Sequence, residues 1–158
     1  MEQSPRRPKP ERPARSLRAT ALGLLARREY SRQELARRLA AATDNPDEIP
    51  ALLDDFERRG WLSEKRVVEQ VLATRRRRYG TQRIAHELRE KGVSETAISQ
   101  ARDTLRESEL DAARAVWKRK FSAAPADARE RARQMRFLQG RGFSLDVIQR
   151  LLRDRDEP

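Results

Sequence analysis

The stretch YGTQRIAHELREKGVSETAI, residues 79–98, decides the fold. It opens on an aromatic residue and a glycine; Leu88 follows nine residues after Tyr79, and Ile98 follows ten residues after Leu88. Most residues in between are good helix formers, and the glycines interrupt them as turns. Ser94 stands four residues before Ile98, where its hydroxyl can accept a hydrogen bond from the first turn of a helix. The stretch therefore predicts two short helices joined by a turn.

The same pattern occurs three times along the chain. The leucine and the isoleucine are ten residues apart in every copy, but the aromatic residue precedes the leucine by nine residues in two copies and by 17 in the third. The third copy therefore carries an eight-residue insertion, which we place near the proline-containing segment 122–129. Each copy also has a capping residue four positions before the isoleucine. The residues are Tyr30, Leu39, Asn45 and Ile49; Tyr79, Leu88, Ser94 and Ile98; and Phe121, Leu138, Ser144 and Ile148.

This recurrence predicts an all-α fold of three tandem three-helix repeats. Such small units cannot bury enough apolar surface alone, so neighbours must stack into an elongated, curved array. We expect the repeats at 16–64, 65–107 and 108–155. Residues 1–15 hold four prolines among charged residues and predict a disordered basic N-terminal tail.

Two local signals in the first repeat concern its helix starts. Ser31 and Glu34 have the spacing of a capping box, which predicts a helix beginning directly after Ser31. Asn45 followed by Pro46 is typical of a helix start, because proline lacks the amide that would go unpaired there. Pro50 conflicts with this start, and we expect the third helix of the repeat to begin later or to be distorted.

The composition excludes several classes of protein. The 158 residues include no cysteine, which removes disulfides, thiol catalysis and thiolate zinc sites, and only one histidine, His86. No glycine-rich phosphate loop or credible catalytic triad occurs, so we expect no enzyme activity, no cofactor and no metal. No apolar run approaches the roughly 20 residues of a membrane span. We therefore expect a cytoplasmic, monomeric binding protein with no membrane segment.

The chain is strongly basic, with 36 lysines and arginines against 25 aspartates and glutamates and a formal net charge of +11. This charge favours an acidic partner, either nucleic acid or an acidic protein surface. The densest run is four consecutive arginines at 75–78, which span a full helical turn and cannot all face one way. A second basic stretch lies within 114–141. The candidate contact residues for a partner or nucleic acid are Arg75, Arg76, Arg77, Arg78, Arg83, Arg89, Lys91, Lys118, Arg119, Lys120, Arg133 and Arg136.

Acidic and aromatic residues qualify this basic character. Acidic residues gather at 44–57, so the first repeat suits protein contact better than phosphate contact. Four aromatic residues flank basic ones, and stacking on nucleic-acid bases is conceivable for them. Because three of the four lie at repeat junctions, we expect core packing instead. The four are Trp61, Tyr79, Trp117 and Phe121.

The order of short motifs resembles the RecX family. Residues 31–35 read SRQEL and residues 56–66 read FERRGWLSEKR, similar to the family's "RS-x-x-EL" helix followed by "G-aromatic-L-x-[DE]-x-R". Residues 79–93 place a glycine ahead of "RI-x-x-EL-x-x-KG-[IV]", as in the family's second repeat, and residues 139–143 resemble the "RGF" turn of its third repeat. Each motif alone is weak, but their order and threefold recurrence are more specific.

The resemblance runs from about Leu17 to Leu152 and implies three tandem three-helix repeats. It also implies binding in the helical groove of RecA filaments, with inhibition of strand exchange, ATP hydrolysis and co-protease function, and so a role in recombination and the SOS response. The partners it implies are RecA protein and the RecA–DNA filament. Weak direct binding to single- or double-stranded DNA is a further possibility.

Two alternatives remain open. Residues 30–62 read like the core of a winged-helix or helix-turn-helix DNA-binding domain. A wing needs two strands directly after Leu62, whereas residues 63–72 continue with a helical period. A nonspecific DNA-coating protein would fit the charge equally well.

Overall fold

The structure, a computed structural model, describes residues 15–156, the last two by their backbone alone. The predicted tail, 1–15, lies outside this range except for its final residue. All regular structure in the described range is helical, which confirms the all-α class. The elements are α1 (Leu17–Leu25), α2 (Arg32–Ala40), the 3-10 helix η1 (Pro46–Glu48), α3 (Ile49–Arg58), α4 (Glu64–Arg75), α5 (Thr81–Glu90), α6 (Glu95–Arg106), α7 (Glu109–Lys120), α8 (Ala128–Gly140) and α9 (Leu145–Asp156).

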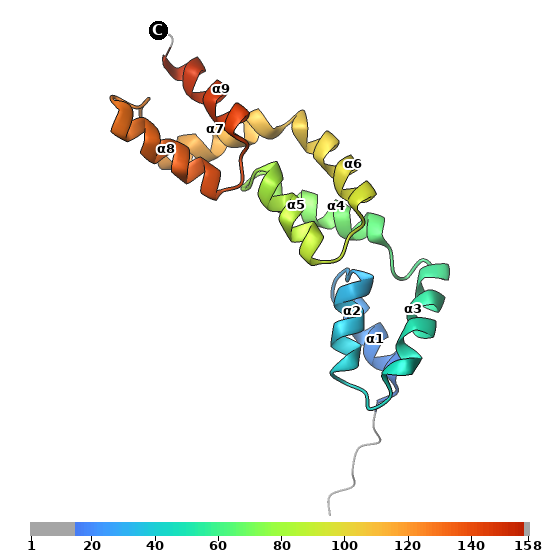
Figure 1. The fold of residues 1–158 in the computed structure, drawn as a ribbon. Helices are drawn as coiled ribbons and strands as arrows, with labels where there is room; N and C mark the ends of the chain where they lie inside the picture. Colours follow the sequence, from blue (N-terminus) through green and yellow to red (C-terminus); the bar gives the residue numbers. More distant parts are fainter. Residues whose placement is uncertain (1–14, 157–158) are drawn as a thin grey trace, which may run out of the picture.

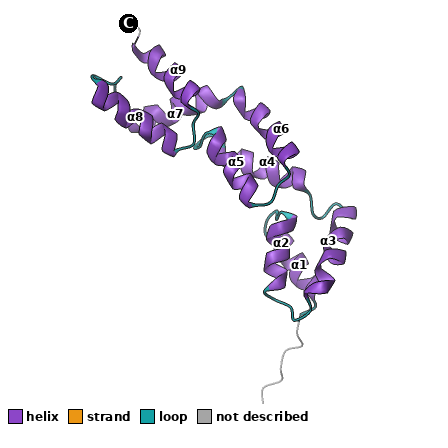
Figure 2. Cartoon of the chain, viewed as in Figure 1, coloured by secondary structure: helices purple, strands orange, loops and turns teal. Residues whose placement is uncertain are grey.

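The helices group in threes along an elongated, bent array (Figure 1). We call α1–α3 unit one, α4–α6 unit two and α7–α9 unit three. Short loops connect the helices within and between the units (Figure 2). This arrangement confirms the predicted array of three tandem three-helix repeats.

Each unit has its own hydrophobic core, built around the residues that recur in the sequence. Leu39, Leu88 and Leu138 are completely buried, each at 0% exposure. The three recurring isoleucines are buried in the same clusters, one cluster to a unit. Three small cores therefore replace the single large core that a chain this rich in charge could not fill.

The predicted serine caps all form. Ser31 and Glu34 make a full capping box: the Glu34 amide donates to Ser31 Oγ and the Ser31 amide donates to Glu34 Oε1, each at 3.1 Å. The Ala97 amide donates to Ser94 Oγ at 3.2 Å, which caps α6. The Val147 amide donates to Ser144 Oγ at 3.4 Å at the start of α9. These bonds satisfy amides that have no partner inside their own helix.

The prediction of a side-chain cap at Asn45 is wrong. Its side chain caps nothing, because the chain first makes the 3-10 turn η1 that begins at Pro46. The α-helix proper begins at Ile49, which leaves Pro50 within its first turn. An amide at this position would have no partner within the helix, so proline is tolerated there. The expectation of a later start was correct.

The insertion in unit three divides between a loop and a helix. Helices α2 and α5 begin seven residues before their recurring leucines, whereas α8 begins ten residues before Leu138. The other inserted residues lengthen the loop 121–127 that precedes α8. Gln134, only 1% exposed, ties the insertion to the core: its Oε1 accepts from the Trp117 indole at 2.8 Å and its amide donates to the Ala123 carbonyl at 3.2 Å.

Neighbouring units meet in a way that repeats along the array. At each joint, the start of the second helix of one unit contacts the turn that follows the second helix of the next unit. We call the contact of units one and two joint one, and that of units two and three joint two. At joint one, Ser31 Oγ donates to the Lys91 carbonyl. At joint two, the Gly80 amide donates to the Arg141 carbonyl at 2.8 Å. Ser31 and Gly80 both stand eight residues before the recurring leucine of their unit.

Joint two requires glycine. A Cβ atom on Gly80 would lie 2.4 Å from backbone atoms of Gly142 and Phe143, which no real contact allows. The Gln82 amide also donates to the Gly142 carbonyl at 3.0 Å. Gly142 has a φ of +88°, a conformation that other residues rarely adopt. The two backbones are therefore in direct contact at this joint.

Candidate functional site

The run of four arginines does not form one surface. Helix α4 ends at Arg75, and the chain turns there. The Arg75 guanidinium pairs with Glu87 at 3.2 Å, whereas Arg76 Nη2 donates to Ser108 Oγ of unit three at 2.7 Å. Arg77 and Arg78 are exposed. Two of the four arginines thus have structural partners, and two are available to an outside partner.

Two hollows lined in part by arginines lie beside this turn. The first has a volume of about 370 Å³, and its two arginines, Arg75 and Arg83, are balanced by Glu87 and Glu90 in the same lining, with Tyr79 between them in the sequence. The second, of about 440 Å³, lies between the end of α4 and α7, where Arg76 and Arg77 meet Arg119. The structure therefore brings Arg75 together with Arg83, and Arg76 and Arg77 together with Arg119.

Cations and aromatic rings alternate along a line from unit two into unit three. The guanidinium of Arg83 lies 4.0 Å from the centre of the Tyr79 ring, and that of Arg141 lies 5.5 Å from it. Arg141 is also 5.4 Å from the Phe137 ring. Each contact is an attraction between a positive charge and the electron-rich face of a ring. We call this series the cation–aromatic line.

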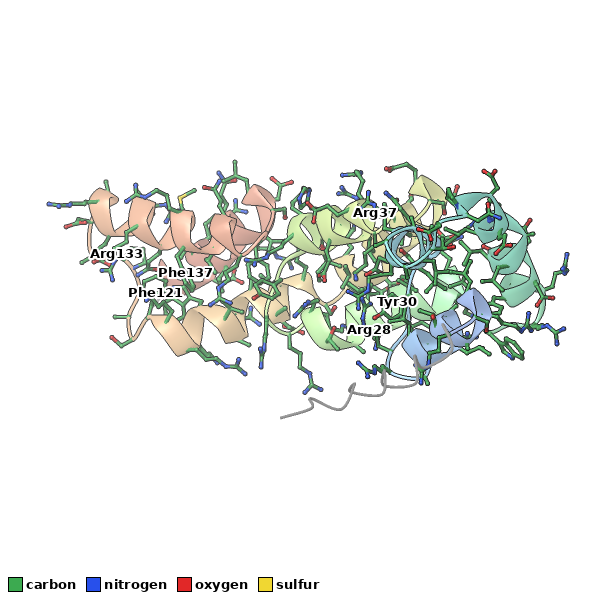
Figure 3. All side chains as sticks on the ribbon, turned by 90° about the horizontal axis from the view of Figure 1, so that it is seen from below. Arg28, Tyr30, Arg37, Phe121, Arg133 and Phe137 are labelled. Carbon is green, nitrogen blue, oxygen red and sulfur yellow. The ribbon has the colours of Figure 1, made fainter. Side chains whose placement is uncertain are left out.

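The line continues to the far end of unit three, where Figure 3 labels Phe121, Arg133 and Phe137. The two phenylalanine rings meet edge to face at 5.4 Å. Lys120 Nζ lies 5.6 Å from the Phe137 ring, and the Arg133 guanidinium lies 5.7 Å from the Phe121 ring. Because these rings are partly buried and already contact cations, they orient the cations more than they offer faces to bases. Arg141 was not among the candidate residues, since nothing in the sequence shows that it reaches two rings.

The remaining candidates divide into paired and free side chains. Arg89 pairs with Glu95 at 2.9 Å, which raises the pKa of Arg89. Lys91 lies in joint one, with its Nζ 3.3 Å from Glu34. Three candidates are exposed with no ion pair within the described side chains: Lys118, Arg119 and Arg136. None of the twelve has a tested partner contact, so their role in binding stays a prediction.

Glu34 is the centre of charge at joint one. Partial burial opposes its ionisation, but the Ser31 amide, Arg28 and Lys91 outweigh burial, so the pKa of the Glu34 carboxyl lies below its ordinary value. Nearby, the Arg28 guanidinium lies 3.6 Å from the centre of the Tyr30 ring. Figure 3 labels Arg28 and Tyr30 in unit one, well apart from Phe121 and Phe137 of unit three.

Ion pairs within unit one neutralise part of the negative charge that its acidic segment shows in the sequence. Arg32 bridges Asp54 at 2.7 Å and Glu57 at 3.0 Å. Asp55 contacts Arg18 at 3.0 Å and Arg59 at 2.9 Å, and the Arg18 hydrogen bond is the first cause that lowers its pKa. Much of the negative charge on α3 is therefore neutralised within the unit.

The prediction that the four aromatic residues pack in cores holds for some of them and fails for one. Trp117 is buried at 4% exposure, and Tyr79 and Phe121 are partly buried. Trp61 is 39% exposed, so the expectation of core packing is wrong for it. Its ring packs against the edge of Phe56 and lies 5.7 Å from Arg18 and 5.1 Å from Arg59. It closes the surface of unit one over the core.

The described residues also bear on metal binding and membrane insertion. Among them, no group of three or more histidine, cysteine, aspartate or glutamate side chains is arranged to hold a metal ion. His86 is exposed and lies 3.1 Å from Glu90. No helix in the described range is both long and apolar enough to cross a bilayer.

Three-helix units in tandem, each with its own core, define a class: repeat-built helical proteins. Family descriptions match two of the units, "RecX, second three-helix domain" at residues 63–101 and "RecX, third three-helix domain" at residues 107–152. The chain is 51% identical to "Regulatory protein RecX" of Leptothrix cholodnii over 142 residues, 90% of each chain. It is 46% identical to the protein of that name from Ralstonia nicotianae, over 90% of this chain and 94% of the other. The chain therefore belongs to the RecX family of regulatory proteins.

A solved structure agrees on the fold. The crystal structure of RecX from Lactobacillus salivarius superposes with a TM-score of 0.71 at 20% identity, over 89% of this chain and 94% of the other. At that identity, the likeness concerns the arrangement of the helices alone.

Proposed function

We propose that this chain binds RecA and the RecA–DNA filament and inhibits strand exchange, ATP hydrolysis and co-protease activity, without catalysis of its own. Membership of a family of regulatory proteins supports the proposal. The observation that carries it is the gathering of exposed cations around joint two, in the second hollow and along the cation–aromatic line. This surface suits acidic protein side chains and phosphates alike.

The array shape suggests how inhibition would work. Three units in a row present a long, bent surface that can contact more than one subunit of a helical filament. Several weak contacts on one rigid chain add up to long residence, because the later contacts form at high effective concentration. A chain held in the groove would obstruct an incoming duplex and clamp the subunits against the motions of ATP turnover. We expect it to act as a cytoplasmic monomer.

Titration of RecA–DNA ATP hydrolysis with this protein tests the proposal. The wild-type chain should lower the hydrolysis rate in a saturable manner. The variant R77E/R119E, which reverses two charges of the second hollow, should need at least about tenfold more protein for the same inhibition. The matched control R37E/R38E changes the charge equally on exposed residues of α2, and Figure 3 shows Arg37 in unit one, away from joint two. Unchanged hydrolysis at saturating wild-type protein would refute the proposal, and equal loss in both variants would refute the assigned surface.

One alternative loses support and one remains. Helix α4 occupies residues 64–75, where a wing would need two strands, so the winged-helix interpretation is disfavoured. A nonspecific DNA-coating function still fits the net charge of +11. Such a protein would bind DNA as tightly without RecA as with it.

A further inference from the structure

A separate cleft lies at joint two, lined by arginines that belong to neither of the two hollows beside the end of α4. It has a volume of about 330 Å³, at the lower end of the range of small-ligand sites. Arg102 and Arg106 enter it from α6 of unit two, and Arg150 enters it from α9 of unit three. Arg102 and Arg106 are four residues apart and so share one face of α6. We call this cavity the arginine cleft.

The positive charge of the arginine cleft is poorly compensated within the described side chains. Arg150 and Arg102 form no ion pair there; Arg102 lies near Glu95, but that carboxylate is held by Arg89 at 2.9 Å. Arg106 has one loose pair, 3.8 Å from Asp103, in which both side chains are at least 70% exposed. Guanidinium groups that share a cleft without counter-charges repel one another, and a bound anion would relieve that repulsion.

The two acidic residues of the cleft do not supply this counter-charge. Glu109 is buried at 8% exposure, and its Oε1 accepts from the Ser144 amide at 3.1 Å and from the Thr81 amide at 3.5 Å. Its charge is thereby engaged by the starts of two helices. Asp146 also lines the cleft and is exposed, and among the described side chains neither acidic residue forms an ion pair with an arginine of the cleft. Three arginines against two carboxylates leave the cleft with a formal net charge of +1.

The arrangement of the arginines selects the kind of anion. A carboxylate is planar and is satisfied by one guanidinium fork. A phosphate group presents oxygens in several directions and suits guanidinium groups that approach from two helices. We propose that the arginine cleft binds a backbone phosphate of a nucleic-acid strand between units two and three. This is a second binding site, and it does not depend on the proposed contact with RecA.

Binding there would couple the ligand to the shape of the array. Arg102 and Arg106 belong to one unit and Arg150 to the next, so a phosphate held by all three would bridge joint two. The same joint contains the backbone contact of Gly80 with Arg141. A bound strand would therefore stabilise the joint at which the cations of the protein surface gather.

The test measures the affinity of the full chain for labelled oligothymidylate in the absence of RecA. Fluorescence anisotropy reports the binding over a series of salt concentrations. The variant R102Q/R150Q removes two of the three charges that would hold the phosphate and should weaken binding about tenfold. Since one phosphate contact is lost, the magnitude of the slope of log K against log salt should fall by about 0.7. The control R37Q/R38Q removes the same charge from exposed residues of α2 and should change the affinity less than about twofold.

The other outcomes overturn the proposal. Equal loss in both variants would mean that binding is diffuse attraction to the net charge. Unchanged oligothymidylate binding, with weakened binding of the RecA–DNA filament, would mean that the cleft receives acidic protein side chains instead. A measurement on the unmodified chain tests the site even if a variant unfolds. On titration with oligothymidylate, the largest amide chemical-shift changes should occur at the turns of α6 and α9 that carry Arg102, Arg106 and Arg150. Changes centred elsewhere would refute the site.

Discussion

The two joints of the array use the same geometry with different chemistry. At joint one, the Ser31 hydroxyl and the Glu34 carboxylate contact Lys91, and Arg66 pairs with Glu29 at 2.9 Å. At joint two, backbone meets backbone through the Gly80 and Gln82 amides. Joint one is therefore a contact of side chains, many of them charged. Joint two also has side-chain contacts, through Arg76 and Glu109, but it adds a direct contact of main chains that joint one lacks.

The difference sets how each joint responds to its surroundings. Ion pairs between partly exposed side chains are weakened by salt and by protonation. Buried backbone hydrogen bonds respond little to either, but they fail when a side chain separates the two backbones. We therefore expect joint two to be rigid and intolerant of substitution, and joint one to be adjustable.

The largest effect should come from G80A. The new Cβ would lie 2.4 Å from the backbone of Gly142, so the joint must open, and we expect a loss of about 2–4 kcal/mol in the free energy of unfolding. Urea denaturation measures it. The control G140A, where a Cβ meets nothing within 4 Å in a helix, should leave stability unchanged or raise it by up to about 1 kcal/mol. Equal effects of the two substitutions would contradict the backbone contact.

E109A should rank second. It removes the acceptor of the Thr81 and Ser144 amides, and amides left buried without a partner cost about 1–3 kcal/mol. The exposed neighbour Glu107 provides the control, since E107A should change stability by less than about 0.5 kcal/mol. A neutral result for E109A would show that water replaces the carboxylate.

S31A should have a smaller effect, at joint one. It removes a helix cap, worth about 1 kcal/mol, together with the hydrogen bond to the Lys91 carbonyl. S94A removes a cap alone, so the excess loss in S31A over S94A measures the joint and should be about 0.5–1 kcal/mol. Identical losses would mean that the joint hydrogen bond contributes nothing.

Acid should produce the smallest change. Because the pKa of Glu34 lies below its ordinary value in the folded chain, its stabilising effect is complete above the unfolded pKa of about 4.3 and is lost as the pH falls through the folded pKa. Denaturation of wild-type and E34Q chains between neutral and acid pH measures it: their difference in stability should shrink as the pH falls below that range. A difference that is constant with pH would exclude ionised Glu34 from joint one.

The fold was predictable because its signals are local and repeated. A capping serine acts within three residues, so Ser94 and Ser144 could be assigned from spacing alone. Asn45 failed because the 3-10 turn after it depends on Pro46 and on where the chain must enter α3. The eight-residue insertion was found by counting, but its division between loop and helix depends on Gln134 and its core contacts.

The surface was less predictable, because it depends on which faces meet between units. The run at 75–78 was visible as charge, but the end of α4 divides it between two hollows. Arg102, Arg106 and Arg150 lie in one cleft although up to 48 residues separate them, and no spacing in the sequence relates them. Lys91 was chosen for its charge, yet its position in a joint follows only from the stacking of units.

The longer α8 also affects whether a second copy of the chain could stack on the end of the array. Ser31 and Gly80 dock on the next unit from a position eight residues before the recurring leucine; in unit three that position is Glu130, a charged residue inside a helix. At the opposite end, Thr43 stands where Gly92 and Gly142 receive the preceding unit, and both glycines have positive φ. Neither end of the array therefore has the residues that form a joint. We expect that these molecules do not assemble end to end into fibres through a joint of this kind, even at high concentration.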